Sequence, residues 1–117
     1  MTYRIVISFE MYYSYKREAT RMSLEQLLHE KRAEIEHIAA RHGVIRLRVF
    51  GSAARGEATG ESDVDFLVQT GPVTSAWFPA GLILDLEALL GRRVDIVTER
   101  ALRPELRESV FHDARSL

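Results

Sequence analysis

The sequence predicts a single α/β domain, in which three short strands alternate with helices. Apolar residues recur at helical spacing in segments 23–42 and 79–90, whereas segments 45–50, 63–69 and 92–98 have the patterns of strands. With 117 residues, the chain has the length of one domain and can bury a core of moderate size. Its hydrophobic fraction of 46% and charged fraction of 28% are ordinary for a soluble globular protein.

Charge and composition argue against several classes of function. The 16 basic and 17 acidic residues leave a net charge of −1, so no bulk positive field is available to hold a nucleic-acid backbone. The chain has no cysteine, which rules out disulfides and thiolate metal sites. No apolar run approaches the length of a membrane span, and the N-terminus lacks the features of a signal peptide. We therefore expect a cytoplasmic protein.

Residues 1–21 are expected to be an N-terminal extension to a domain at 22–117. The apolar residues between positions 5 and 9 have the composition of a short strand, so the extension is predicted to be an edge strand or a loose arm. A separate hypothesis is that Met22 is the natural start, because a clear helix signal follows it directly.

A helix is predicted to begin after Ser23 and to end at Gly43. Ser23 and Gln26 form a capping box, in which both side chains can bond free backbone N–H groups of the first turn. Gly43 readily adopts the left-handed conformation that follows many helices. His29 and His37 are expected to be surface or half-buried residues, not metal ligands. The predicted apolar face, interrupted by Lys31, consists of Leu24, Leu27, Leu28, Ile35, Ile38 and Ala39.

Two strands follow, joined by a turn and a loop. Gly51-Ser52 ends the first strand, residues 53–56 are expected to make a short helical turn, and 57–62 is polar enough for an exposed loop. Side chains alternate between the two sides of a strand, so each strand should turn one apolar face to the core. The predicted core faces are Ile45, Leu47 and Val49 in the first strand, and Val64, Phe66 and Val68 in the second.

Two more helices are predicted around the third strand. The helix at 79–90 should end at Gly91, with Trp77 and Phe78 packed at its entry. Pro104 opens the last helix, where the missing N–H of proline has no cost. The last helix has a narrow apolar side of Leu106, Val110 and Ala114.

Three aspartates are predicted to meet on one face of the sheet. Asp63 and Asp65 lie on one side of the second strand, and Asp95 faces away from the core between Val94 and Ile96. A right-handed crossover would place the second and third strands close together. Three such carboxylates repel one another without a cation, and an all-oxygen site suits Mg²⁺. Two ions about 3.5–4 Å apart can hold the attacking and leaving oxygens of a displacement.

The Gly51-Ser52 turn is a candidate phosphate site. Glycine lets a phosphate approach the backbone closely, and the serine hydroxyl and nearby N–H groups can bond triphosphate oxygens. Arg55 has two alternative roles: contact with a phosphate, or fixing of the loop through Glu57 or Glu61. Each signal alone is common and usually structural. Together, with ten residues between the turn and the two aspartates, they favour chemistry on a nucleotide.

The combined pattern resembles the signature of the polymerase-beta-type nucleotidyltransferase superfamily. The Gly-Ser turn, the spacer of ten residues and the Asp-x-Asp pair match that signature, and the string from Gly51 to Asp65 is similar to its minimal nucleotidyltransferase (MNT) branch. Arg-Val-Asp-Ile-Val at 93–97 resembles the branch's third-carboxylate strand. The resemblance covers roughly residues 22–112, leaves 1–21 outside, and implies the fold of that superfamily, a small mixed sheet flanked by helices.

The resemblance also implies roles for the site residues. Asp63 and Asp65 would bind Mg²⁺, as two ions, and Asp95 would complete the metal site or act as general base. Gly51 and Ser52 would hold the triphosphate of ATP. Such proteins often pair, as antitoxins, with a small helical HEPN-family ribonuclease toxin, and some transfer AMP to a tyrosine of that toxin. The implied assembly is a hetero-oligomer with the toxin.

Three hypotheses for function follow. The chain has no room for an acceptor domain, so the acceptor must come from a partner or a second copy. The first hypothesis is a protein adenylyltransferase that modifies the toxin. The second is an antitoxin that neutralises by binding, with Trp77, Phe78 and Phe111 as candidate contacts, although core packing is the expected role of each. The third is a small-molecule, antibiotic-type nucleotidyltransferase. We expect no direct contact with nucleic acid or membrane.

Overall fold

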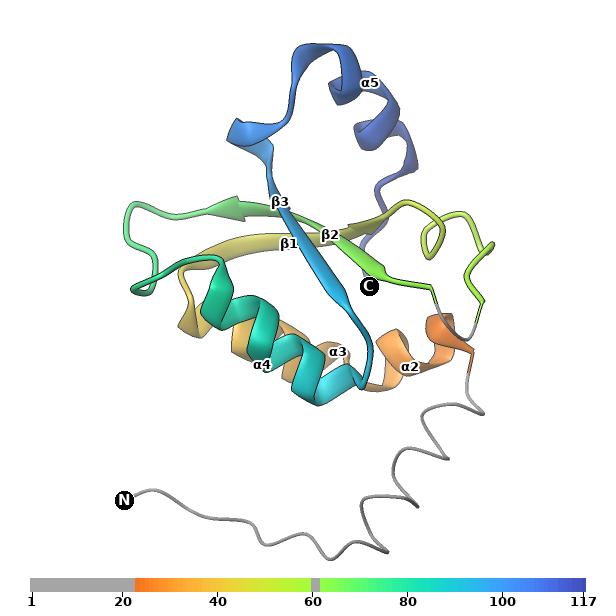
Figure 1. The fold of residues 1–117 in the computed structure, drawn as a ribbon, viewed down its shortest axis with the longest axis horizontal. Helices are drawn as coiled ribbons and strands as arrows, with labels where there is room; N and C mark the ends of the chain where they lie inside the picture. Colours follow the sequence, from red (N-terminus) through yellow and green to blue (C-terminus); the bar gives the residue numbers. More distant parts are fainter. Residues whose placement is uncertain (1–22, 60–61) are drawn as a thin grey trace, which may run out of the picture.

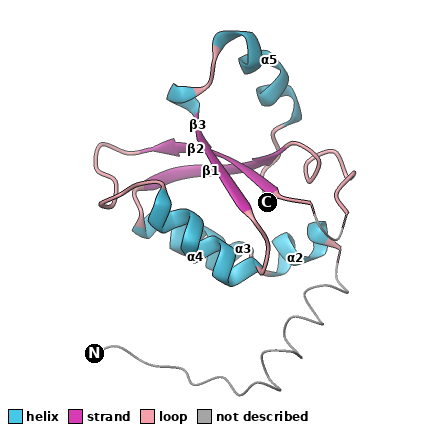
Figure 2. Cartoon of the chain, in the orientation of Figure 1, coloured by secondary structure: helices cyan, strands magenta, loops and turns pink. Residues whose placement is uncertain are grey.

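The computed structural model describes residues 23–59 and 62–117, and it places three strands in one sheet with the order β1-β2-β3. The expected extension at 1–21 and the alternative start at Met22 lie outside the described residues. The elements in chain order are α2 (Leu24–Glu30), α3 (Arg32–Arg41), β1 (Val44–Phe50), β2 (Val64–Thr70), α4 (Ala80–Leu90), β3 (Val94–Thr98), the 3₁₀ helix η1 (Glu99–Ala101) and α5 (Pro104–Asp113). This confirms the predicted α/β class (Figure 2).

The sheet is mixed and is covered unequally on its two faces. β1 pairs with β2 antiparallel, and β2 pairs with β3 parallel. Helices α2, α3 and α4 lie along one face, whereas η1 and α5 stand on the opposite side (Figure 1). None of the described helices combines the length and apolar character needed to cross a membrane.

The main core lies between the sheet and helices α2, α3 and α4. The central strand β2 contributes Val64, Phe66 and Val68, whose side chains are fully buried, as the alternation predicted. Leu67 is also buried, on the side of η1 and α5, so β2 is covered on both faces near its middle. The predicted helix faces contribute Leu24, Leu27, Leu28, Ile35, Ala39, Leu82, Leu86 and Leu90.

The first predicted helix is two helices that meet at Lys31. The capping box of Ser23 and Gln26 is present, with both reciprocal hydrogen bonds. Lys31 has φ −93° and ψ 5°, outside the α-helical range, so the helix axis breaks there. Lys31 N–H still donates to the Leu27 carbonyl and Ile35 N–H to the Lys31 carbonyl, so the hydrogen-bond ladder continues across the break.

The predicted core position of Ile45 is wrong, because β1 contains an irregularity at this residue. Val44 pairs with Thr70 and Arg46 pairs with Gln69, so two steps along β1 correspond to one step along β2. A bulge of this kind changes which side a residue faces. Ile45 is consequently 65% exposed, and Val44 takes the buried place.

The predicted packing of Trp77 at the entry of α4 is also wrong. Trp77 has φ +61°, and its side chain is 88% exposed. Phe78 does pack against the core, as predicted. The segment before α4 is held differently: the His42 ring contacts Ser75 Oγ through Nδ1 at 2.6 Å and Asp85 Oδ2 through Nε2 at 2.7 Å.

Candidate functional site

Strand pairing places Asp65 beside Asp95. The two residues are direct partners in the parallel register of β2 and β3, on strands about 4.8 Å apart. Their neighbours Val64 and Val94 are also paired and belong to the main core, so alternation sends both aspartates to the opposite face. Asp63 immediately precedes β2 and shares the side of Asp65. The prediction that the second and third strands lie close together in one sheet is confirmed.

The Gly51 turn approaches the carboxylate of Asp65 closely. Phe50, the last residue of β1, is the register partner of Asp65, so the chain leaves β1 beside that aspartate. Gly51 has φ +72°, and a Cβ atom on it would lie 2.6 Å from Asp65 Oδ2. Only glycine satisfies both conditions, since other L-residues are strained at this φ and carry that Cβ.

The carboxylates of Asp63, Asp65 and Asp95, which form the acidic face of the sheet, repel one another. Burial raises the pKa of Asp65, and the nearby charges of Asp95 and Asp63 raise it further. Arg55 acts in the opposite direction and lowers this pKa in part. Asp65 is half-buried, whereas Asp63 and Asp95 are exposed. The arrangement therefore favours the arrival of a cation or of positive donors at Asp65.

The raised pKa of Asp65 predicts how the stability of the fold should respond to pH. A carboxyl whose pKa is raised by folding contributes stability below its unfolded pKa, and the contribution is lost as pH rises through its folded pKa. At neutral pH the ionised Asp65 therefore destabilises the fold. We expect Asp65→Asn to raise the melting temperature by a few degrees at pH 7 without Mg²⁺, and the gain to shrink toward about pH 4. An Asp65→Asn variant whose melting temperature differs from that of the wild type by the same amount at pH 7 and at about pH 4 would contradict this prediction.

The Gly-Ser turn has the short helical geometry that the sequence predicted. Arg55 N–H donates to the Gly51 carbonyl at 3.2 Å, and Glu57 N–H donates to the Ser52 carbonyl at 2.9 Å. The N–H groups at the start of such a turn are free to face a ligand. Ser52 itself is half-buried beside them. The turn begins at Gly51, which lies close to the Asp65 carboxylate.

Arg55 is bound by two carboxylates in this structure. Its Nε donates to Glu57 at 3.0 Å and its Nη1 donates to Asp113 at 2.8 Å. The hydrogen bonds to Glu57 and Asp113 raise its pKa. The sequence left two roles open for Arg55: contact with a phosphate, or fixing of the loop through Glu57 or Glu61. The structure shows the contact with Glu57, and Glu61 lies outside the described residues. Asp113, at the end of α5, was not anticipated, because 58 positions separate it from Arg55.

A second arginine, Arg48, links β1 to both η1 and α5 on the side of the sheet that carries the aspartates. Arg48 on β1 donates to Glu99 of η1 at 2.7 Å and stacks on Phe111 of α5 at 5.0 Å. No residue of α5 is buried, so these arginine contacts, with the Val49–Arg115 backbone bridge, fasten it to the sheet. Sequence periodicity gave no signal for either pair, since both join residues more than 50 positions apart.

The residues present suit a magnesium site that a nucleotide would complete. Within residues 23–59 and 62–117, no three His, Cys, Asp or Glu side chains already converge as metal ligands. Mg²⁺ is usually held by one or two carboxylates together with substrate phosphates, so a closed protein cage is not required. The raised pKa of Asp65, caused by burial and two like charges, marks the place where a cation would be stabilised.

Comparisons with known proteins identify the family of the chain. The family model for the nucleotidyltransferase domain matches residues 31–117. A protein of Thermococcus cleftensis named protein adenylyltransferase MntA is 37% identical over 92 residues, which cover 79% of this chain and 93% of the relative. A protein of Methanocaldococcus jannaschii is 36% identical over 87 residues, covering 74% of this chain and 94% of the relative.

Solved structures share the fold. One described as a minimal nucleotidyltransferase has a TM-score of 0.73 and 47% identity, and the match covers 83% of this chain and 98% of the other. A structure described as a toxin–antitoxin with AMP-PNP has a TM-score of 0.62 at 20% identity, covering 80% of this chain and 71% of the other. The second similarity, at this identity, concerns the fold alone.

Proposed function

Because the chain belongs to the nucleotidyltransferase domain family, we propose that it is an antitoxin that transfers AMP from ATP to a hydroxyl group of its toxin. The proposal extends to a HEPN-type ribonuclease as the toxin, a tyrosine as the acceptor, Mg²⁺ as the cofactor and the cytoplasm as the place of action. The relative named as a protein adenylyltransferase and the fold shared with a toxin–antitoxin structure support this direction.

One observation carries the proposal: the Gly51 turn and the Asp65–Asp95 pair come together at one end of the sheet. A Cβ atom on Gly51 would lie 2.6 Å from Asp65 Oδ2, and Asp65 is the register partner of Asp95 on the neighbouring parallel strand. A nucleotide triphosphate with a divalent cation requires backbone donors for its phosphates close to carboxylates for the cation. The described residues therefore supply the donor side of such a transfer.

The residues can be given roles in the transfer. Asp63 and Asp65 would hold Mg²⁺, which when bound offsets the charge of the triphosphate. Ser52 and the neighbouring N–H groups bind the β- and γ-phosphates. Asp95, the more exposed partner of the paired acids, takes the proton of the acceptor hydroxyl. The hydroxyl oxygen forms a bond to the α-phosphorus, the bond from that phosphorus to the bridging oxygen breaks, and pyrophosphate leaves.

The test is a mass measurement on the partner. The purified chain is incubated with the protein encoded by the adjacent gene, as the candidate partner, together with ATP and Mg²⁺, and the candidate partner is weighed intact. We expect a gain of one or more AMP groups, lost when Asp63 is changed to Asn or when EDTA removes the metal. Peptide mapping then shows whether tyrosine carries the group. An unmodified partner under all these conditions would contradict the proposal.

Neutralisation by binding alone is the second candidate function. It is favoured by the 88% exposure of Trp77, a large apolar surface of the kind found at protein contacts. A chain with both Asp63→Asn and Asp65→Asn decides between the two. If this double variant still rescues cells that express the toxin, binding is sufficient. If rescue is lost while complex formation persists, AMP transfer is the mechanism.

A further inference from the structure

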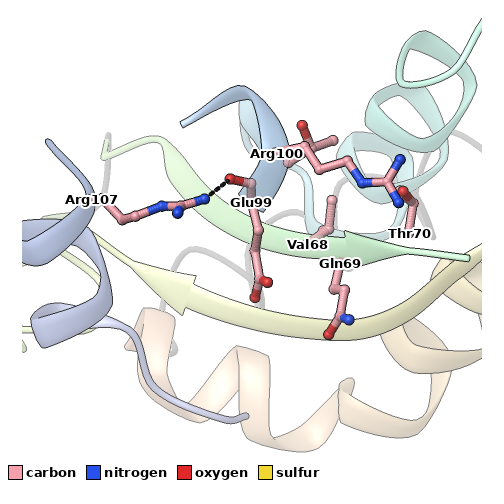
Figure 3. A pocket seen from close by; sticks show the side chains of 7 residues that line it. Val68, Gln69, Thr70, Glu99, Arg100 and Arg107 are labelled. Carbon is pink, nitrogen blue, oxygen red and sulfur yellow. Dashed lines mark hydrogen bonds between the residues drawn. The ribbon is translucent and has the colours of Figure 1, made fainter. Parts of the chain in front are cut away.

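A positively charged hollow lies on the acidic side of the sheet, beyond the donor site. It has a volume of about 200 Å³ and lies where β2 and β3 end and η1 begins. Arg100 of η1 reaches toward Thr70 at the end of β2, and Arg107 enters from α5 (Figure 3). The remaining lining residues are Val68, Gln69, Thr98 and Glu99.

The charge of this hollow is not balanced from within. Within the part of the chain that the structure describes, Arg100 has no hydrogen bond or ion pair. Arg107 donates only to the backbone carbonyl of Glu99, at 3.2 Å. The Glu99 carboxylate points away and is bound by Arg48 at 2.7 Å. Two guanidinium groups therefore face the hollow with their neighbouring carboxylate already engaged, which makes it a site for an anion.

Size and charge select the kind of anion. Cavities that enclose a whole small-molecule ligand measure roughly 300–1,000 Å³, so this hollow takes a single side-chain-sized group. Arg100 and Arg107 line it without a carboxylate of their own, because Arg48 binds Glu99, so an anionic side chain that enters is held by charge-assisted hydrogen bonds. A carboxylate carries one charge and fits the flat fork of a guanidinium.

The position relates the hollow to the acceptor. Gln69 follows Asp65 by four residues on the same side of β2, a separation of about 13 Å. A standard protein interface covers about 800 Å² on each partner, which is roughly 30 Å across. One bound protein can therefore place a hydroxyl at Asp95 and an acidic side chain in the hollow at the same time.

We propose that the hollow between Arg100 and Arg107 binds an Asp or Glu side chain of the acceptor protein and so positions its hydroxyl at the acidic face. This inference rests on the proposed function, since it needs a protein acceptor. Arg100 and Arg107 are positioning residues in it: they hold the acceptor and take no part in bond making. Their loss affects binding of the partner and leaves the chemistry of the bound complex intact.

The test compares Arg100→Glu with Arg103→Glu. Both variants reverse one exposed charge in the same segment, but Arg103 does not line the hollow. We expect Arg100→Glu to raise the KM for the neighbour-encoded partner about tenfold, with kcat and the KM for ATP unchanged. The Kd of the unmodified partner, measured without ATP, should rise equally. Arg103→Glu should change each quantity by less than about twofold.

Two results would overturn the inference. One is an equal Kd for the Arg100→Glu and Arg103→Glu variants. The other is saturable binding of inorganic phosphate at Arg100, seen by NMR titration, together with an unchanged Kd for the partner, which would make the hollow a free-phosphate site. A wild-type chain that binds the partner through Arg100 but never modifies it contradicts the proposed function and leaves the docking site standing.

Discussion

Asp65→Asn should reduce AMP transfer by about a thousandfold or more while the chain remains folded. Asp65 lies between the Gly51 turn and Asp95, so it occupies the centre of the proposed site. A neutral amide binds Mg²⁺ weakly and cannot offset the charge of the triphosphate complex. The initial rate of partner modification, followed by intact mass, measures the loss.

The matched control is Asp85→Asn. Asp85 is a half-buried aspartate on α4 that contacts the His42 ring, and its amide replacement keeps an oxygen acceptor there. We expect the control to retain the wild-type rate within about twofold. If Asp65→Asn keeps more than about a tenth of the rate, the acid pair is not the centre of the reaction. The expected rise in melting temperature of Asp65→Asn separates a catalytic defect from unfolding.

Gly51→Ala should lower AMP transfer by about a hundredfold and destabilise the chain by about 1–2 kcal/mol. The stability loss follows from φ +72°, which an alanine adopts at a cost. The loss of activity has a separate cause: the new Cβ would lie 2.6 Å from Asp65 Oδ2 and must displace that carboxylate. Denaturant unfolding and the rate of partner modification measure the two effects.

Gly91→Ala separates these two causes. Gly91 ends α4 at φ +64°, close to the φ of Gly51, but a Cβ there meets no atom within 4 Å. The two alanine variants should therefore lose similar stability, and only Gly51→Ala should lose activity. If Gly51→Ala and Gly91→Ala modify the partner at the same rate, the position of the Asp65 carboxylate does not limit AMP transfer, and the prediction is wrong.

Much of the fold was predictable because its signals are local. Capping by Ser23 and Gln26, the stop at Gly91 and the start at Pro104 depend on neighbouring residues, and all three are present. The misplaced residues, Ile45 and Trp77, lie where β1 has its bulge and where the segment before α4 takes a left-handed turn. Those features depend on how separate segments pack, which periodicity does not contain.

For the site, alternation along strands and the crossover rule bring Asp65 and Asp95 together, and the resemblance supplies their expected roles. The sequence by itself therefore determined the strands, the acidic face and the glycine turn, because each follows from residue type and short-range spacing. Only the tertiary structure decided the close approach of Gly51 to Asp65, the hydrogen bond from Arg55 to Asp113, and the hollow between Arg100 and Arg107. These depend on the path of the chain between elements and on where long side chains end, which the order of residues does not show.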